Sequence, residues 1–219
     1  MAVRAGLAVL VVAGAAYAVR RPLLMSAPAC LAGRWHGCGD TENGVLFLMF
    51  LGLPPAAVLV WALARHRRAA DAPAAWRASL AEVGMVHGTA PMVWLTLMPG
   101  PGAGAVPGRV SLVPLRDLVT MGPLGIAGNL VILAALGFFA PMRFAALASL
   151  PRVLAFGAGC SALVETLQYV LRLDRVSSVD DVLVNAVGAA LFGVASRRWW
   201  RTAAPVPTEQ SHPAPARAD

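Results

Sequence analysis

Two neighbouring apolar stretches near the C-terminus carry polar side chains at spacings that suit binding or acid–base chemistry. Glu165 and Gln168 are three positions apart, which places both on one face of a helix. Asp181 and Asn185 are four positions apart in the next stretch and also share a face. Arg175 lies in the short connection, and antiparallel helices joined this closely pack side by side. We therefore expect a carboxylate able to act as a base and a guanidinium able to hold a phosphate-like group to converge.

The elements that position these side chains belong to a very apolar chain. Its 219 residues are 58% hydrophobic and 13% charged, and the mean hydropathy is +0.67. Five segments approach or exceed the length needed to cross a hydrocarbon layer of about 30 Å: 45–64, 78–98, 123–140, 151–171 and 179–196. A shorter sixth, 5–19, is interpreted as a retained anchor, with a cleaved signal peptide as the alternative. The sequence predicts an all-α, polytopic transmembrane bundle of about six spans, with Pro54 and Pro55 kinking the second.

Basic residues predict the orientation of the bundle. The formal charge is +7, and every one of the 18 basic side chains is Arg, which excludes mechanisms that need a lysine. The connection 65–77 is the most basic short loop, so the positive-inside rule places it and both termini in the cytoplasm. Segments 20–44, 99–122 and 172–178 then face outside, although Arg20 and Arg21 oppose this bias. Because the arginines flank apolar runs, we expect membrane lipids as partners and no nucleic acid.

The polar cluster has a structural and a functional interpretation. In the structural one, Asp180 caps a helix, Asp181 pairs with Arg175, and the amides bond across a helix interface that Gly188 keeps close. In the functional one, the cluster is an outward-facing pocket for an envelope molecule, and Asn129 of the preceding span faces it. Glu165 favours function, because it lies well inside an apolar run where a capping role is excluded.

Cysteines and a histidine supply further candidates. Cys30 and Cys38 lie in the first outer loop, where a disulfide is expected; a metal site with His36 and Asp40 is the alternative. We predict no metal and no cofactor. His87, in the third predicted span, is interpreted as a buried histidine with satisfied hydrogen bonds.

The polar residues of the last two spans resemble the signature of the VanZ-like family of bacterial membrane proteins. The similarity rests on Glu165-x-x-Gln168 followed by Arg175, Asp181, Asn185 and Gly188. The segment 113–116 and Asn129 with Leu136-Gly137 agree with it, whereas Leu133, Ala135 and Ser178 depart from the usual family residues. The resemblance implies a multi-pass protein of the bacterial cell membrane, in a family whose named member lowers susceptibility to the glycopeptide antibiotic teicoplanin.

The apolar segments, the composition and the resemblance together divide the chain into three parts. Residues 1–77 form an N-terminal helix pair with a Cys-containing outer loop, residues 78–196 the VanZ-like membrane domain, and residues 197–219 a basic anchor with a disordered cytoplasmic tail. We interpret the chain as a non-catalytic envelope protein whose outer cluster engages a lipid, a cell-wall precursor or a lipoglycopeptide. The alternatives are an intramembrane hydrolase or transferase with Glu165 or Asp181 as general base, and an ion-coupled transporter using Glu82 and Glu165.

Overall fold

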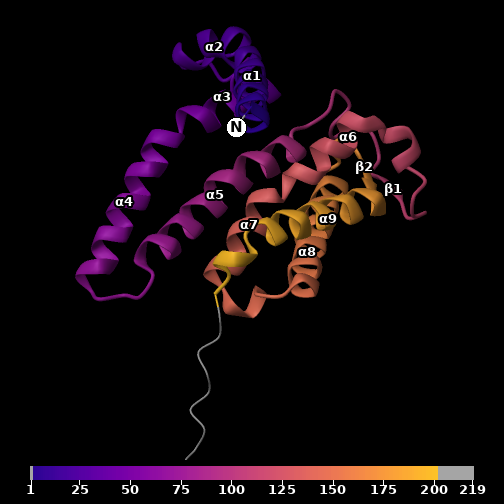
Figure 1. Ribbon diagram of the computed structural model, residues 1–219. Helices are drawn as coiled ribbons and strands as arrows, with labels where there is room; N and C mark the ends of the chain where they lie inside the picture. The colour runs from indigo at the N-terminus through magenta and orange to yellow at the C-terminus, as the bar shows by residue number, and fades with distance from the viewer. Residues whose placement is uncertain (1, 202–219) are drawn as a thin grey trace, which may run out of the picture.

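The computed structural model describes residues 2–201 and is mostly helical (Figure 1). The predicted disordered tail after residue 201 lies outside the described residues. The helices are α1 (Ala2–Met25), α2 (Ala27–Leu31), α3 (Glu42–Leu51), α4 (Leu53–Ala69), α5 (Ala75–Leu97), α6 (Leu118–Ile132), α7 (Ala134–Arg143), α8 (Leu150–Val170) and α9 (Val179–Ala195). Two 3-10 turns, Ala145–Leu147 and Arg197–Trp199, follow α7 and α9.

Proline and glycine account for the bend in the second predicted span. Helices α3 and α4 meet at Gly52 with an angle of 41°, and Pro54 and Pro55 lie in the first turn of α4. Proline is tolerated in a first turn because its missing N–H has no intrahelical acceptor there. The predicted kink is therefore present, as a break between two helices.

The fourth predicted span also divides, into α6 and α7. The break lies at Leu133, whose side chain is 1% exposed and packs with Val153 of α8 and Ala189 of α9. Helix α9 approaches α6 and α7 through glycine: a Cβ on Gly188 would lie 2.1 Å from the carbonyl oxygen of Leu130, and one on Gly137 would lie 2.0 Å from that of Ala189. These close backbone contacts assemble the C-terminal half around α9.

A small parallel sheet joins the loop 99–117 to the turn between α8 and α9. Strand β1 (Arg109–Ser111) pairs with β2 (Val176–Ser178), with Arg109 opposite Val176 and Ser111 opposite Ser178. The predicted all-α fold does not include this sheet, because strands of three residues are too short to show an alternating pattern in the sequence. The pairing places the loop 99–117 against the predicted polar cluster.

An ion-pair cluster joins three helices at the opposite end. Glu82 of α5 forms salt bridges with Arg67 of α4 and Arg143 of α7, and Arg67 also donates to Ser79 at 2.8 Å. The main chain at Arg201 donates to Pro141 at the end of α7, so the chain leaves the bundle at this same end. Glu82 thus joins helix ends, and the transporter interpretation gains no support from it.

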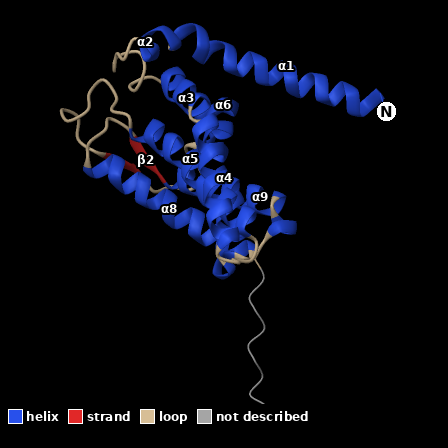
Figure 2. Cartoon of the chain, turned by 90° about the vertical axis from the view of Figure 1, so that its left-hand side faces the viewer, coloured by secondary structure: helices blue, strands red, loops and turns tan. Residues whose placement is uncertain are grey.

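Some of the six predicted spans correspond to helices that are long and apolar enough to cross a membrane. By length and composition, two helical segments suffice to cross a membrane, Leu118–Arg143 and Leu150–Val170, and the bent pair α3–α4 makes a third if it counts as one span. Helix α1 extends away from the body of the molecule, as Figure 2 shows. The chain is therefore a membrane protein, and its six-span topology stays a prediction.

Candidate functional site

All six residues of the predicted polar cluster line one cavity of about 350 Å³. It lies where α6, α8 and α9 meet beside β2, and Thr96 at the end of α5 also lines it. We call it the polar cavity, and its cluster residues are Asn129, Glu165, Gln168, Arg175, Asp181 and Asn185. The structure brings these residues together from three helices and one turn.

Glu165 holds the turn between α8 and α9. Its side chain is 8% exposed, and its Oε2 accepts a hydrogen bond of 3.0 Å from the main-chain N–H of Ser178. Its own carbonyl oxygen accepts from the Ser177 hydroxyl at 2.8 Å. Charged acceptors form stronger hydrogen bonds than neutral ones, so the carboxylate fixes the geometry of the turn while lining the cavity.

Asp181 pairs with an amide and not with the expected cation. Asn129 Nδ2 donates to Asp181 Oδ1 at 2.6 Å, which links α6 to α9. Arg175 instead donates from Nε to the carbonyl oxygen of Met98 at 3.3 Å, and it forms no salt bridge with any residue between 2 and 201. The structural interpretation that paired Asp181 with Arg175 is therefore wrong, and the guanidinium is available to a ligand.

The two other amides bond to neighbouring helices. Gln168 Nε2 donates to the carbonyl oxygen of Thr96 at 2.9 Å, and Asn185 Nδ2 donates to the Ser161 hydroxyl at 2.8 Å. Asn185 is 3% exposed, and its Oδ1 is buried with no partner in the part of the chain that the structure describes. An unpaired buried acceptor costs about 1–3 kcal/mol, so a donor from a ligand or water is expected there.

Several residues around the cavity were missed or misassigned from the sequence. Ser178, not Asp180, caps α9, through a 3.1 Å bond from the N–H of Asp180. Asp180 is fully buried and accepts from main-chain N–H groups at Leu115 (2.6 Å), Asp117 (2.8 Å) and Leu118 (3.2 Å). Arg109 on β1 forms a 3.1 Å salt bridge with Asp174. Sequence spacing carries no signal for partners more than sixty positions apart.

A wider groove of about 840 Å³ adjoins the polar cavity between α5 and α6. We call it the apolar groove, because Met92, Leu95, Leu124 and Val131 contribute to its walls. The two hollows share the residues at their junction, which are Thr96, Asn129, Ile132, Arg175, Val176 and Asp181. A molecule with a polar end and an apolar end fits this pair of hollows.

The side chains of the polar cavity suit binding more directly than catalysis. Ser161 accepts from Asn185, and the carboxylates of Glu165 and Asp181 each accept from an amide donor. His87 lies apart from the cavity and packs on Gly52 at the α3–α4 bend. Its Nε2 is buried without a partner in residues 2–201, so the expectation of a satisfied histidine is wrong.

Part of the chain matches the model of a known protein family. A family model described as VanZ/LLP1 matches residues 85–200, which is more than half of the sequence. The chain belongs to the VanZ/LLP1 family. Neither the curated proteins nor the solved structures give a match. The match contains the whole polar cluster of this VanZ-like protein, together with Asp174 and Asp180.

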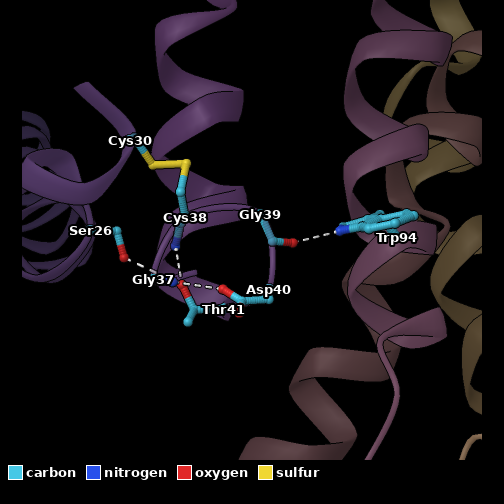
Figure 3. Close-up of a disulfide and its surroundings, with 9 residues drawn as sticks. Ser26, Cys30, Gly37, Cys38, Gly39, Asp40, Thr41 and Trp94 are labelled. Carbon is cyan, nitrogen blue, oxygen red and sulfur yellow. Dashed lines mark hydrogen bonds between the residues drawn. A yellow bond between two sulfur atoms is a disulfide. The ribbon is translucent and has the colours of Figure 1, made fainter. Parts of the chain in front are cut away.

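The disulfide loop lies before the VanZ-like region. Cys30 and Cys38 form a disulfide, which occupies both thiols and removes them from the alternative metal site (Figure 3). His36 Nδ1 and Asp40 Oδ2 are 2.8 Å apart, and within the described residues no group of three His, Cys, Asp or Glu side chains is arranged to hold a metal. Trp94 of α5 donates to the carbonyl oxygen of Gly39 at 2.9 Å, which docks the loop on the VanZ-like region.

Proposed function

We propose that this VanZ-like protein is a multi-pass protein of the bacterial cell membrane that lowers susceptibility to glycopeptide antibiotics such as teicoplanin. It acts without catalysis, by binding a lipid or cell-wall component in the outward-facing polar cavity. Family membership supports the link to glycopeptides. The observation that carries the proposal is the cavity itself, which six polar side chains line, among them Asn185, whose Oδ1 has no hydrogen-bond partner in residues 2–201.

Charge and burial support binding as the role of the cavity. Ionisable side chains inside a membrane helix cost roughly 2.5–3.5 kcal/mol each on insertion scales, so they are retained where they have a task. Glu165 and Asp181 already have one partner each, whereas Arg175 has only a carbonyl oxygen among the described residues. The arrangement leaves hydrogen-bonding capacity for a ligand that enters from the outer end.

The test is a susceptibility assay on a bacterial strain that carries the gene or a variant of it. Arg175→Gln and Asn185→Leu remove one donor and one acceptor of the cavity, and both are expected to abolish the protection against teicoplanin. Arg172→Gln is the matched control, because Arg172 is exposed in the same turn and does not line the cavity. Membrane abundance is measured by immunoblot for each strain.

Three outcomes contradict the proposal. Deletion of the gene without any change in teicoplanin susceptibility removes the antibiotic role. Loss of protection only in step with loss of abundance shows that the cluster is structural. Turnover of a lipid-linked wall precursor by the purified protein, read by mass spectrometry and lost in Glu165→Gln, establishes an enzyme instead.

A further inference from the structure

The polar cavity contains acceptors that lack donors. Asn185 Oδ1 is buried and unpaired, as described above. Glu165 accepts only through Oε2 and Asp181 only through Oδ1, so within residues 2–201 the second oxygen of each carboxylate has no donor. A ligand that fills the cavity must therefore bring N–H or O–H groups, and two carboxylates favour a cationic donor. A primary ammonium offers three N–H donors and one positive charge.

At the junction of the cavity with the apolar groove, the protein offers a positive charge, so the ligand needs an anionic group there. Arg175 lines both the polar cavity and the apolar groove, and only its Nε is bonded, to Met98. Within residues 2–201 its terminal nitrogens form no hydrogen bond and no salt bridge. A guanidinium binds phosphate through two parallel hydrogen bonds, so the junction suits a phosphate group.

The apolar groove suits an acyl chain of the same ligand. Its wall on α6 includes Leu124, which is 89% exposed, and Val131, which is 48% exposed. None of the residues of α6 is buried. Since the segment Leu118–Arg143 is long and apolar enough to cross a membrane, we expect this wall of the groove to face hydrocarbon. An acyl chain reaches it from the bilayer without passing through water.

We propose that the occupant is a zwitterionic phospholipid whose headgroup carries a phosphate and a primary ammonium. The phosphate lies on Arg175, the ammonium lies among Glu165, Asp181 and Asn185, and an acyl chain lies along the apolar groove. This inference rests on the proposed function, because it names the ligand of the same cavity.

The experiment compares three lipids on the purified full-length protein. The protein is placed in nanodiscs made of equal parts of phosphatidylcholine, phosphatidylethanolamine and phosphatidylglycerol, and the retained lipids are counted by native mass spectrometry. Phosphatidylcholine has the same phosphate and charge but no N–H donor, and phosphatidylglycerol has the phosphate without a cation. We expect phosphatidylethanolamine to be retained about tenfold over both, the factor that corresponds to one charge-assisted hydrogen bond.

Single substitutions test the contributions of the polar cavity and of the apolar groove separately. Asp181→Asn is expected to remove the preference for phosphatidylethanolamine. Arg175→Gln is expected to reduce retention of all three lipids, because all three carry the phosphate. Gly128→Leu fills the apolar groove, because a Cβ on Gly128 meets nothing within 4 Å, and it is expected to reduce retention of all three lipids. Gly159→Leu is the matched control: Gly159 also has open space around it, and it lies on α8 outside both hollows.

The outcomes separate this inference from the proposed function. Equal retention of phosphatidylethanolamine and phosphatidylcholine by the unaltered protein overturns the inference, and so does a preference that survives Asp181→Asn. If the cavity variants still abolish teicoplanin protection in that case, the proposed function stands with another ligand. Selective retention of phosphatidylethanolamine by a protein whose deletion leaves susceptibility unchanged supports the inference and removes the antibiotic role.

Discussion

Asp180 accepts hydrogen bonds from three main-chain N–H groups, which lie at the end of the loop 99–117 and at the start of α6. It is fully buried, and its two oxygens accept from Leu115, Asp117 and Leu118. A buried carboxylate is tolerated because the N–H groups at the start of α6 compensate its charge. The same bonds satisfy donors that have no intrahelical partner. Asp180 thus orients α6, and through α6 the Asn129 side chain of the polar cavity.

Replacing Asp180 is expected to destabilise the protein strongly. Asp180→Ala removes three hydrogen bonds to a buried charged acceptor and is expected to cost about 3 kcal/mol, since a hydrogen bond to a charged group contributes roughly 1.5–3 kcal/mol and these donors are partly exposed to water. Asp180→Asn keeps one acceptor oxygen and is expected to cost less. Thermal unfolding in detergent, followed by size-exclusion fluorescence, gives both Tm values. Equal Tm values for Asp180→Asn and an Asp71→Asn control are the result that would refute this role, because Asp71 is exposed and Asn tolerates its left-handed φ of 50°.

Asp40 makes the disulfide loop sensitive to acid. The hydrogen bond from His36, with a further one of 2.7 Å from the Gly37 N–H, lowers the pKa of the Asp40 carboxyl below its ordinary value of 3.8. A pKa that is lower in the folded state gives stability that is present above the unfolded pKa. That stability is lost as the pH falls below 3.8 and through the lowered pKa of the folded state.

The lowered pKa of Asp40 predicts how the melting temperatures of wild type and Asp40→Asn change with pH. Wild type is expected to melt at a higher Tm than Asp40→Asn at pH 6, and the difference between the two Tm values is expected to shrink as the pH falls below 3.8. Melting curves of both proteins at pH 6 and below pH 3.8 test it. A difference that grows on acidification is inconsistent with the pKa direction.

The helices of the C-terminal half pack through small residues. Gly188 of α9 lies against the carbonyl oxygen of Leu130, and Gly137 of α7 lies against that of Ala189. Close backbone approach of this kind provides van der Waals contact where lipid removes the hydrophobic drive for association. It also sets the distance between α6 and α9, and hence the reach of the bond from Asn129 to Asp181.

Gly188→Ala is expected to separate these helices. The added Cβ would overlap a carbonyl oxygen, so the backbones must move, at a cost of about 1–3 kcal/mol. Gly159→Ala is the control, because its Cβ meets open space and alanine favours a helix. Melting temperatures of the two variants should move in opposite directions. If both rise, the contact at Gly188 is not restrictive.

The sequence predicts the helices better than their contacts. Apolar length identifies α8, expected at 151–171 and found at Leu150–Val170, because a long apolar run in a membrane has few alternatives to a helix. Spacing also brings Glu165, Gln168 and Asp181 to one cavity. The break at Leu133 and the pairing of β1 with β2 depend on contacts between segments that are far apart in the chain. The local residue pattern of a single sequence carries no signal for such contacts.

The two ends of the molecule differ in chemistry. One end holds the polar cavity, the sheet and the disulfide loop. The other end holds Glu82 between Arg67 and Arg143, with Arg65 stacked on Trp61 and Arg68 on Trp76. Arginine beside tryptophan is typical of a membrane interface, and arginine clusters favour the cytoplasmic side. Disulfides persist in oxidising compartments, which favours the outside for the other end.

This asymmetry predicts the topology of the protein. A green fluorescent protein joined to the C-terminus is expected to fluoresce, because it folds in the cytoplasm, and alkaline phosphatase inserted at 101–107 is expected to be active outside. Arg65→Gln with Arg68→Gln weakens the positive-inside signal without touching the Glu82 ion pairs, so a mixed population with reduced fluorescence is expected. Phosphatase activity at the C-terminus of the unaltered protein would reverse the orientation, and it would turn the polar cavity toward the cytoplasm.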